Sequence, residues 1–183
     1  LELVPDAPFE ADRCGSCTRC LDACPTNAFV GPRVLDATKC ISYLTIETKG
    51  EIHPDLRERV GDLVYGCDIC QSVCPWNVKF AGESGEPAFA PREAIAQKSA
   101  LELSRDLIST DEAQFRLNFR NSPMKRAKRR GLARNAAVVL GNIGSPEDTH
   151  LLTRALEDPE PLVRDHAAWA LERIRLRSPA DSR

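Results

Sequence analysis

The sequence predicts a mainly α-helical protein in two parts, a cysteine-rich part of short helices and loops followed by a part of paired helices. Three observations lead to this fold class: eight cysteines crowded into residues 14–74, helix start signals from Ser99 onward, and a short alanine-rich pattern that occurs twice near the end. No run is long and apolar enough to cross a membrane, so we expect no membrane partner.

The cysteines form two related runs. The first reads C-x2-C-x2-C-x3-C-P, and it is the ligand pattern of a bacterial-type [4Fe–4S] cluster, in which the fourth cysteine ligates a second cluster. The second run repeats the end of the first, and Cys40 is the cysteine left to complete it. If ligands cross between the runs, the first cluster takes Cys14, Cys17, Cys20 and Cys74, and the second takes Cys40, Cys67, Cys70 and Cys24. The sequence therefore predicts a two-[4Fe–4S] ferredoxin-like domain.

Cysteines can serve two other purposes in a chain of this kind. A disulfide scaffold suits a tiny secreted domain rather than 183 residues without a signal peptide. Zinc remains an alternative, but zinc sites usually pair two short C-x2-C units, whereas three cysteines at two-residue gaps followed by C-P are typical of iron–sulfur proteins. Thiolate ligands favour a reducing, cytoplasmic location.

The cluster domain is expected at residues 1–80. Asp36 caps a short helix that carries Cys40, and the His53-Pro54 pair opens another helix. Residues 81–98, rich in glycine and proline, are expected to form a linker.

Residues 99–183 are expected to form a small α-helical domain. Ser99 starts a helix with leucines one turn apart, and Ser109 with Glu112 resembles a capping box. A cap residue followed by proline is typical of a helix start, and it occurs at Ser122-Pro123, Ser145-Pro146 and between Asp158 and Pro161.

A pattern of two alanines, a leucine and an isoleucine occurs twice, at 136–143 and again at 167–174. Each copy is interpreted as the second helix of a helical pair, so the domain resembles HEAT-like repeats, with two ordinary amphipathic helices as the alternative. Two units are too few for an independent solenoid, and we therefore expect them to pack on the cluster domain.

Charge divides the chain in the same way. Residues 1–113 carry 11 Lys and Arg against 19 Asp and Glu, whereas residues 114–183 carry 14 against 8. No acidic residue occurs from 115 to 145, so this segment is a candidate nucleic-acid surface. A solvated face or an acidic protein partner are the alternatives.

Two further features have a limited interpretation. The chain opens without methionine, and residues 1–4 resemble the end of a strand, so we expect the C-terminal part of a longer protein. Trp76 follows Cys74-Pro75 and either shields a cluster or is an ordinary core tryptophan. No catalytic set of side chains stands out, and the three histidines are interpreted as structural or surface residues.

Four segments together resemble one family. They are residues 14–25, 40–47, 65–77 and 122–135, which include C-P-W-N at 74–77 and S-P-x-K-R at 122–126. The chain resembles the C-terminal part of the epoxyqueuosine reductases, cobalamin-dependent enzymes of tRNA queuosine synthesis. The resemblance implies that two clusters pass electrons to a cobalamin in an upstream domain, which also supplies the catalytic acid, so that this chain alone is inactive.

The resemblance also implies partners. It implies contact with the tRNA anticodon stem-loop through Lys125, Arg126, Lys128, Arg129, Arg130 and Arg134. We further expect an electron donor that remains to be identified, and a monomer. The alternatives are a stand-alone two-cluster electron carrier whose helical tail binds a protein, and a cobalamin-linked reductase of small molecules.

Overall fold

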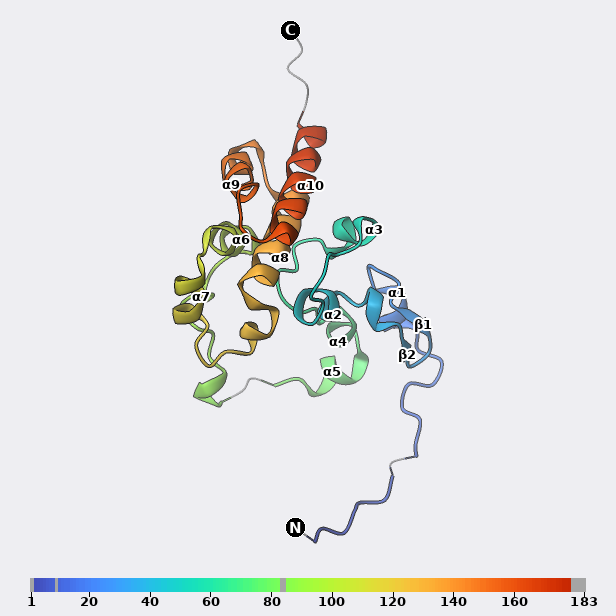
Figure 1. Cartoon of the computed structure of the whole chain (residues 1–183). Coiled ribbons are helices and arrows are strands. Elements are labelled where there is room, and N and C mark those ends of the chain that lie inside the picture. The colour runs from blue at the N-terminus through green and yellow to red at the C-terminus, as the bar shows by residue number, and fades with distance from the viewer. Residues whose placement is uncertain (1, 9, 83–84, 179–183) are drawn as a thin grey trace.

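The computed structural model describes residues 2–8, 10–82 and 85–178 (Figure 1). Its first half contains α1 (Arg19–Asp22), β1 (Phe29–Gly31), β2 (Val34–Leu35), η1 (Ala37–Lys39), α2 (Ile41–Ile46), α3 (Pro54–Arg57), η2 (Glu58–Val60), α4 (Ile69–Ser72) and α5 (Pro75–Phe80), where η denotes a 3-10 helix. The second half contains η3 (Pro87–Phe89), α6 (Ala100–Ser109), α7 (Glu112–Asn118), η4 (Pro123–Ala127), α8 (Lys128–Ile143), η5 (Pro146–Asp148), α9 (Thr149–Ala155) and α10 (Pro161–Arg177). The mainly α fold class is confirmed.

The first described residues contribute no helix or strand to the fold. Residues 2–8 have no helix or strand, so the expected strand there is wrong for residues 2–4, and Leu1 lies outside the described residues. Residues 83–84 of the expected linker and 179–183 of the expected helical domain also lie outside them. No helix in the described ranges is both long and apolar enough to span a bilayer.

The helix starts follow the sequence signals with two differences. Ser99 starts α6, as expected, and it also forms a capping box with Glu102. The box expected at Ser109 and Glu112 is wrong: α6 continues to Ser109, and the box joins Asp111 to Gln114. The Ser-Pro signals open the single 3-10 turns η4 and η5, and the α-helices follow them directly.

The two alanine-rich copies form the long helices α8 and α10 at the centre of the second half. Ala136, Ala137 and Ala167 are fully buried between them. A Cβ atom at Gly141 would come within 2.4 Å of the Trp169 ring, so these two helices approach closely only because small residues line the contact. This packing is the reason the repeat pattern is rich in alanine.

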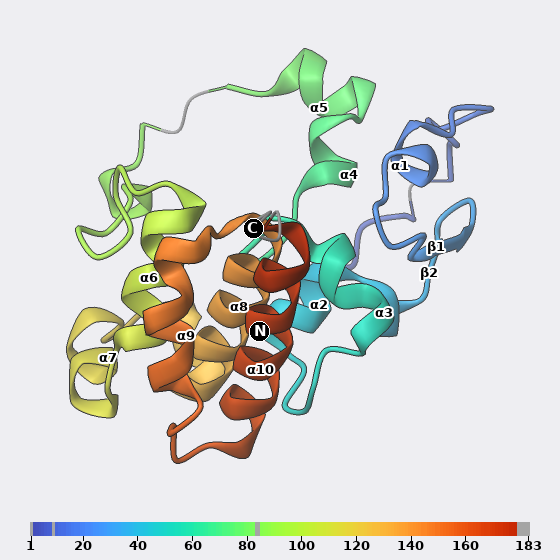
Figure 2. The ribbon, with the colours of Figure 1, turned by 90° about the horizontal axis from the view of Figure 1, so that it is seen from above.

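The cysteine-rich part shares a core with the helical part. Val138 of α8 and Trp169 of α10 pack with Ile41, Leu44 and Ile52 of the first half. Figure 2 shows α8 between α6 on one side and α2 on the other. The helical repeats therefore pack on the cysteine-rich part, as the sequence predicts for so short a repeat array.

Hydrogen bonds to one buried histidine strengthen this contact. His166 on α10 is fully buried, and its Nε2 accepts a bond of 3.2 Å from the Ile52 amide, so the ring proton sits on Nδ1 and is donated to the Leu162 carbonyl. Burial, together with the nearby Arg57 charge, lowers the pKa of His166 to about 4.

This pKa predicts a pH dependence of stability. Below about pH 6.5 the unfolded chain binds a proton at His166 that the folded chain does not, so stability present at pH 7 is lost as the pH falls towards 4. We expect the free energy of unfolding to fall by about 2 kcal/mol from this group between pH 7 and pH 5. Urea unfolding of the wild type and His166→Gln checks it. The dependence of the free energy of unfolding on pH should become weaker in His166→Gln and persist in His150→Gln, in which the replaced residue is exposed. Equal pH dependence in all three proteins would contradict the assignment to His166.

Candidate iron–sulfur centre and basic surface

The two cysteine runs adopt the same local structure, 50 residues apart. Thr18 before α1 has φ −116° and ψ 5°, and Asp68 before α4 has φ −117° and ψ 15°. In each loop the carbonyl of that residue accepts from the amides three and four positions later. Equivalent positions are therefore held by Cys17 and Cys67, by Cys20 and Cys70, and by Cys24 and Cys74.

Three other cysteines lie in the electrostatic neighbourhood of Cys67. Burial raises the pKa of the Cys67 thiol, and the neighbouring thiols of Cys40, Cys70 and Cys24 raise it further. These are the four residues expected to hold the second cluster, with Cys24 coming from the other run. The neighbourhood supports the crossed assignment, which stays a prediction.

The Cys24 sulfur is held by hydrogen bonds. It accepts from the Ala28 amide at 3.3 Å and lies 3.6 Å from the Thr26 hydroxyl. Burial opposes ionisation of this thiol, but these bonds outweigh it and lower the pKa of Cys24. Hydrogen bonds to ligand sulfur are one of the means by which a protein tunes an iron–sulfur potential.

A tryptophan joins the two ends of the first ligand set. The indole N–H of Trp76, two residues after Cys74, donates to the Arg13 carbonyl at 2.9 Å, immediately before Cys14. Trp76 also stacks on Phe80 with ring centroids 5.8 Å apart. Because 43% of Trp76 is exposed, it is not a core tryptophan.

The chemistry of the donors fits iron–sulfur clusters. All eight cysteines are free, with Cys14 and Cys17 exposed and the other six half-buried. Soft thiolates without accompanying histidines or carboxylates suit clusters of this kind. Among the described residues no three metal-binding side chains already converge on one point, so the ligand sets follow from the order and neighbourhood of the cysteines.

The structure separates the six expected tRNA contacts into two groups. Lys125, Arg126 and Lys128 are exposed and Arg130 is half-buried. Arg129 and Arg134, however, are buried, and the expectation that they contact tRNA is corrected by their surroundings.

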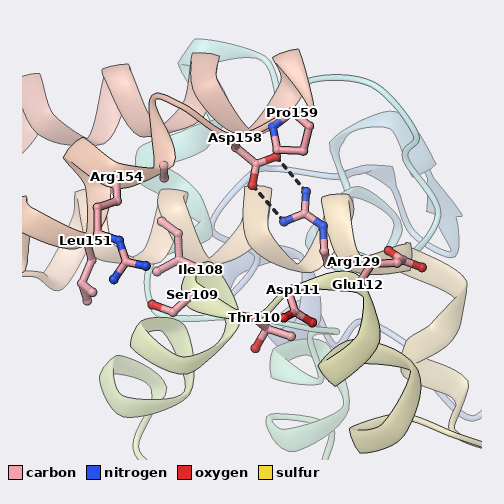
Figure 3. A pocket seen from close by; sticks show the side chains of 11 residues that line it. Ile108, Ser109, Thr110, Asp111, Glu112, Arg129, Leu151, Arg154, Asp158 and Pro159 are labelled. Carbon is pink, nitrogen blue, oxygen red and sulfur yellow. Dashed lines mark hydrogen bonds and ion pairs between the residues drawn. The ribbon is translucent and has the colours of Figure 1, made fainter.

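Arg129 is committed to an ion pair. Its guanidinium donates to both carboxylate oxygens of Asp158 at 2.8 and 2.7 Å, at a pocket of about 290 Å³ between the α6–α7 and α9–α10 turns (Figure 3). This pairing lowers the pKa of Asp158 even though burial opposes ionisation. A bidentate pair is strong, so Arg129 joins α8 to the turn before α10 instead of reaching a ligand.

Arg134 is fully buried at the contact between the two halves. Its guanidinium donates to the carbonyls of Leu44 at 2.7 Å, Thr48 at 2.9 Å and Gly50 at 2.7 Å, and to the amide oxygen of Asn135. The Asn135 side chain in turn donates to backbone carbonyls at Thr45 and Val64. These bonds fix the end of α2 and the segment before Cys67, so this arginine is structural.

Acidic residues distant in sequence neutralise part of the basic segment. Arg126 pairs with Glu47 at 2.6 Å and Arg130 with Glu160 at 3.6 Å. The lack of acidic residues within the segment therefore does not leave its charge uncompensated, because other elements bring carboxylates to it.

A basic hollow remains on the surface. It has a volume of about 480 Å³ and is lined by Glu112, Phe115, Arg116, Lys125, Lys128, Arg129, Arg130 and Glu160. Within the described part of the chain, Lys125 and Lys128 have no acidic partner. Arg116, on α7, is not among the expected contacts, and its place in the acid-free segment was the only signal for it. We refer to this feature as the basic hollow.

The backbone at the rim of this hollow is strained. Lys128 has φ 61° and ψ 167°, a conformation that is almost restricted to glycine and costs on the order of 1–3 kcal/mol. It lies where η4 turns into α8. A lysine held in such a conformation points to a role for its side chain at this surface.

Two family models match the chain. Residues 13–77 match the 4Fe-4S double cluster binding domain, and residues 124–182 match HEAT repeats. The chain therefore contains an iron–sulfur cluster domain followed by HEAT repeats.

Curated relatives cover almost all of this chain. Two proteins named epoxyqueuosine reductase, from Xanthomonas campestris pv. campestris and Pseudomonas aeruginosa, are 43% and 44% identical to it over 172 and 174 residues. The matches cover 93% and 94% of this chain and 47% of each relative. The chain thus spans about half the length of the curated relatives that it matches.

Solved structures share the fold of this chain. An epoxyqueuosine reductase from Bacillus subtilis superimposes with a TM-score of 0.81 at 36% identity, covering 94% of this chain and 45% of that one. An epoxyqueuosine reductase crystallised with an epoxyqueuosine-modified tRNA stem loop gives a TM-score of 0.76 at 36% identity, covering 93% of this chain and 44% of that one.

Proposed function

Since the chain belongs to the epoxyqueuosine reductase family, of whose named members it spans about half the length, we propose that it is the electron-transfer and tRNA-binding part of such an enzyme. The longer protein would reduce epoxyqueuosine to queuosine at the wobble position of tRNA. The observation that carries the proposal is the pair of matching cysteine loops together with a basic hollow on the same molecule.

The reaction defines what the chain must supply. Removing an epoxide oxygen to leave a carbon–carbon double bond consumes two electrons and two protons and releases water. Two [4Fe–4S] clusters, when bound, supply one-electron redox chemistry each, which suits a two-electron reduction. Cobalamin, held by the part of the longer protein that this chain does not span, would supply the reduced metal that acts on the epoxide.

The residues of this chain hold and tune those electrons. The crossed sets of cysteines would bind the clusters, and the amide and hydroxyl at Cys24 set the environment of one sulfur. No catalytic residue is assigned here, so this chain alone would not turn over substrate. We further propose that the protein is cytoplasmic and monomeric and that it receives electrons from a donor that remains to be identified.

RNA would dock in the basic hollow. Lys125 and Lys128 would contact backbone phosphates as point charges, and Arg116 would bind phosphate in a bidentate manner. Arg126 follows Lys125 in η4 but does not line the hollow, and it would bind a neighbouring phosphate. Arg130 would contribute from the edge of the hollow. Arg129 and Arg134 are left out because both are buried and already paired.

Neutralising the hollow should weaken RNA binding. We expect the triple variant with Gln at Arg116, Lys125 and Lys128 to bind an RNA hairpin of anticodon stem-loop sequence about tenfold or more weakly at moderate salt. The slope of log K against log salt should fall in magnitude by about 3, because each of the three lost phosphate contacts removes nearly one unit. Fluorescence anisotropy at several salt concentrations on the anaerobically purified, cluster-loaded chain measures both.

A matched control carries the same charge change elsewhere. The triple variant with Gln at Lys39, Lys79 and Arg175, all exposed on other elements, should retain wild-type affinity and slope. Equal weakening of both triple variants, or no RNA binding by the wild type, would reject the RNA interface. The alternative of a helical tail that binds a protein partner would then be preferred.

A further inference from the structure

The basic segment is bonded directly to both segments that approach the second ligand set. The Tyr65 hydroxyl, two residues before Cys67, donates to the Pro123 carbonyl of η4 at 2.8 Å. On the other side, Lys49 just beyond α2 donates to the Arg126 carbonyl at 3.0 Å. η4 therefore contacts the chain that follows Cys40 and the chain that precedes Cys67.

Those two segments are also bonded to each other. The Gly66 amide donates to the Thr45 hydroxyl at 2.9 Å, and that hydroxyl donates to the Ile41 carbonyl in the first turn of α2. A displacement at η4 is thus carried by short hydrogen bonds to the backbone beside Cys40 and beside Cys67. Contiguous bonded networks of this kind can carry energetic coupling between sites.

Glu47 provides the charge in this arrangement. It is the C-cap residue of α2. At this end of a helix the partial negative charge of the helix dipole disfavours a carboxylate. Its position is explained by Arg126, whose guanidinium lies 2.6 Å from the Glu47 carboxylate. The arginine side chain is 65% exposed, so solvent screens the ion pair and the pair holds the arginine only weakly.

An RNA phosphate can therefore compete with the Glu47 carboxylate for the guanidinium of Arg126. Guanidinium binds phosphate in a bidentate manner, and the exchange replaces one charge-assisted pair with another. The Glu47 carboxylate then loses its counter-charge at the end of the helix that begins beside Cys40. An unpaired negative charge opposes the addition of an electron nearby, and so lowers the reduction potential of a neighbouring cluster.

We propose that Glu47 is a positioning residue for Arg126, and that their ion pair couples RNA binding at η4 to the reduction potential of the cluster held by Cys40, Cys67, Cys70 and Cys24. The inference rests on the proposed function. RNA binding makes this cluster the stronger one-electron donor, so that an electron passes on more readily when RNA is in place. By thermodynamic reciprocity, reduction of the cluster weakens RNA binding by the same factor.

Paired measurements on the cluster-loaded protein test the coupling. Redox titration followed by electron paramagnetic resonance is carried out with and without the RNA hairpin, and the cluster concerned is recognised by its loss in Cys40→Ala. In the wild type we expect RNA to lower the potential by about 30 mV or more, since about 59 mV corresponds to tenfold for one electron. RNA affinity should be about threefold weaker for reduced than for oxidised protein.

Two variants separate the coupling from RNA binding itself. In Glu47→Gln the RNA-induced shift should fall to less than half of the wild-type shift, while RNA binding persists. Glu112→Gln is the matched control, because Glu112 also pairs with an exposed arginine, Arg116, at 3.1 Å, but on α7 in the basic hollow and away from α2. Its shift should equal that of the wild type.

The outcomes are distinguishable. RNA binding without any shift, or an equal shift in Glu47→Gln and wild type, would overturn the coupling and leave the proposed function standing. Failure of the wild type to bind RNA would overturn both.

Discussion

Replacing Arg134 with methionine is expected to lower the free energy of unfolding by about 3–5 kcal/mol. Methionine fills much of the space but donates no hydrogen bond, so the carbonyls of Leu44, Thr48 and Gly50 lose their shared charged donor in a site without solvent access. Burial lowers the pKa of Arg134 to about 10, which still leaves it charged near neutral pH. The decrease in the free energy of unfolding comes from buried carbonyl groups that are left without a hydrogen-bond donor.

Anaerobic urea unfolding measured by far-UV circular dichroism checks this expectation. For a chain of this size the free energy of unfolding falls by about 2 kcal/mol per molar urea, so the urea midpoint of Arg134→Met should be lower by roughly 2 M. Arg175→Met is the control, since Arg175 is exposed and pairs only with Glu172 on the same helix. If the two variants unfold within about 1 kcal/mol of each other, Arg134 does not hold the two halves together.

Removing one cysteine should remove one cluster. We expect Cys40→Ala to retain about half of the wild-type iron, because only the set that contains Cys40 loses a ligand. The crossed assignment makes a sharper statement: Cys24→Ala should destroy the same cluster as Cys40→Ala, and Cys74→Ala the same cluster as Cys14→Ala. Iron analysis and the electron paramagnetic resonance spectrum of the surviving cluster measure this.

The pairing of spectra decides between the assignments. Crossed ligands give matching spectra for Cys24→Ala and Cys40→Ala. If Cys24→Ala instead matches Cys14→Ala, each run keeps its own fourth cysteine and the crossing is wrong. Full iron content in Cys40→Ala would show that Cys40 is not a ligand.

Local chemistry made the cluster domain predictable. Cysteine spacing is a direct constraint on how a loop surrounds a cluster, and cap residues act within one turn, so both can be seen in a linear sequence. The same applies to the alanines of α8 and α10, because their helical spacing places them on one face that packs against a neighbouring helix. The sequence predicts this capping box at Ser109, two residues before the observed box at Asp111, because two candidate caps compete within one turn.

Long-range partners account for what the sequence could not predict. Arg129 and Arg134 belong to a run of basic residues, and nothing local distinguishes them from Lys125 or Lys128. Their partners are Asp158, 29 residues away, and carbonyls 84 to 90 residues away. Only the fold decides which cations face water.

The bonds from α8 and α10 to the first half also impose an order on biosynthesis. A chain leaves the ribosome from its N-terminus at about 5–20 residues per second, so all eight cysteines emerge before Arg134 and His166 are made. The Ile52 amide can form its hydrogen bond only after a histidine 114 residues later in the chain has been synthesised. During those seconds the thiols belong to a nascent segment whose shape is not yet fixed. Cluster assembly on this protein should therefore be completed after translation, once the last repeat has closed over α2.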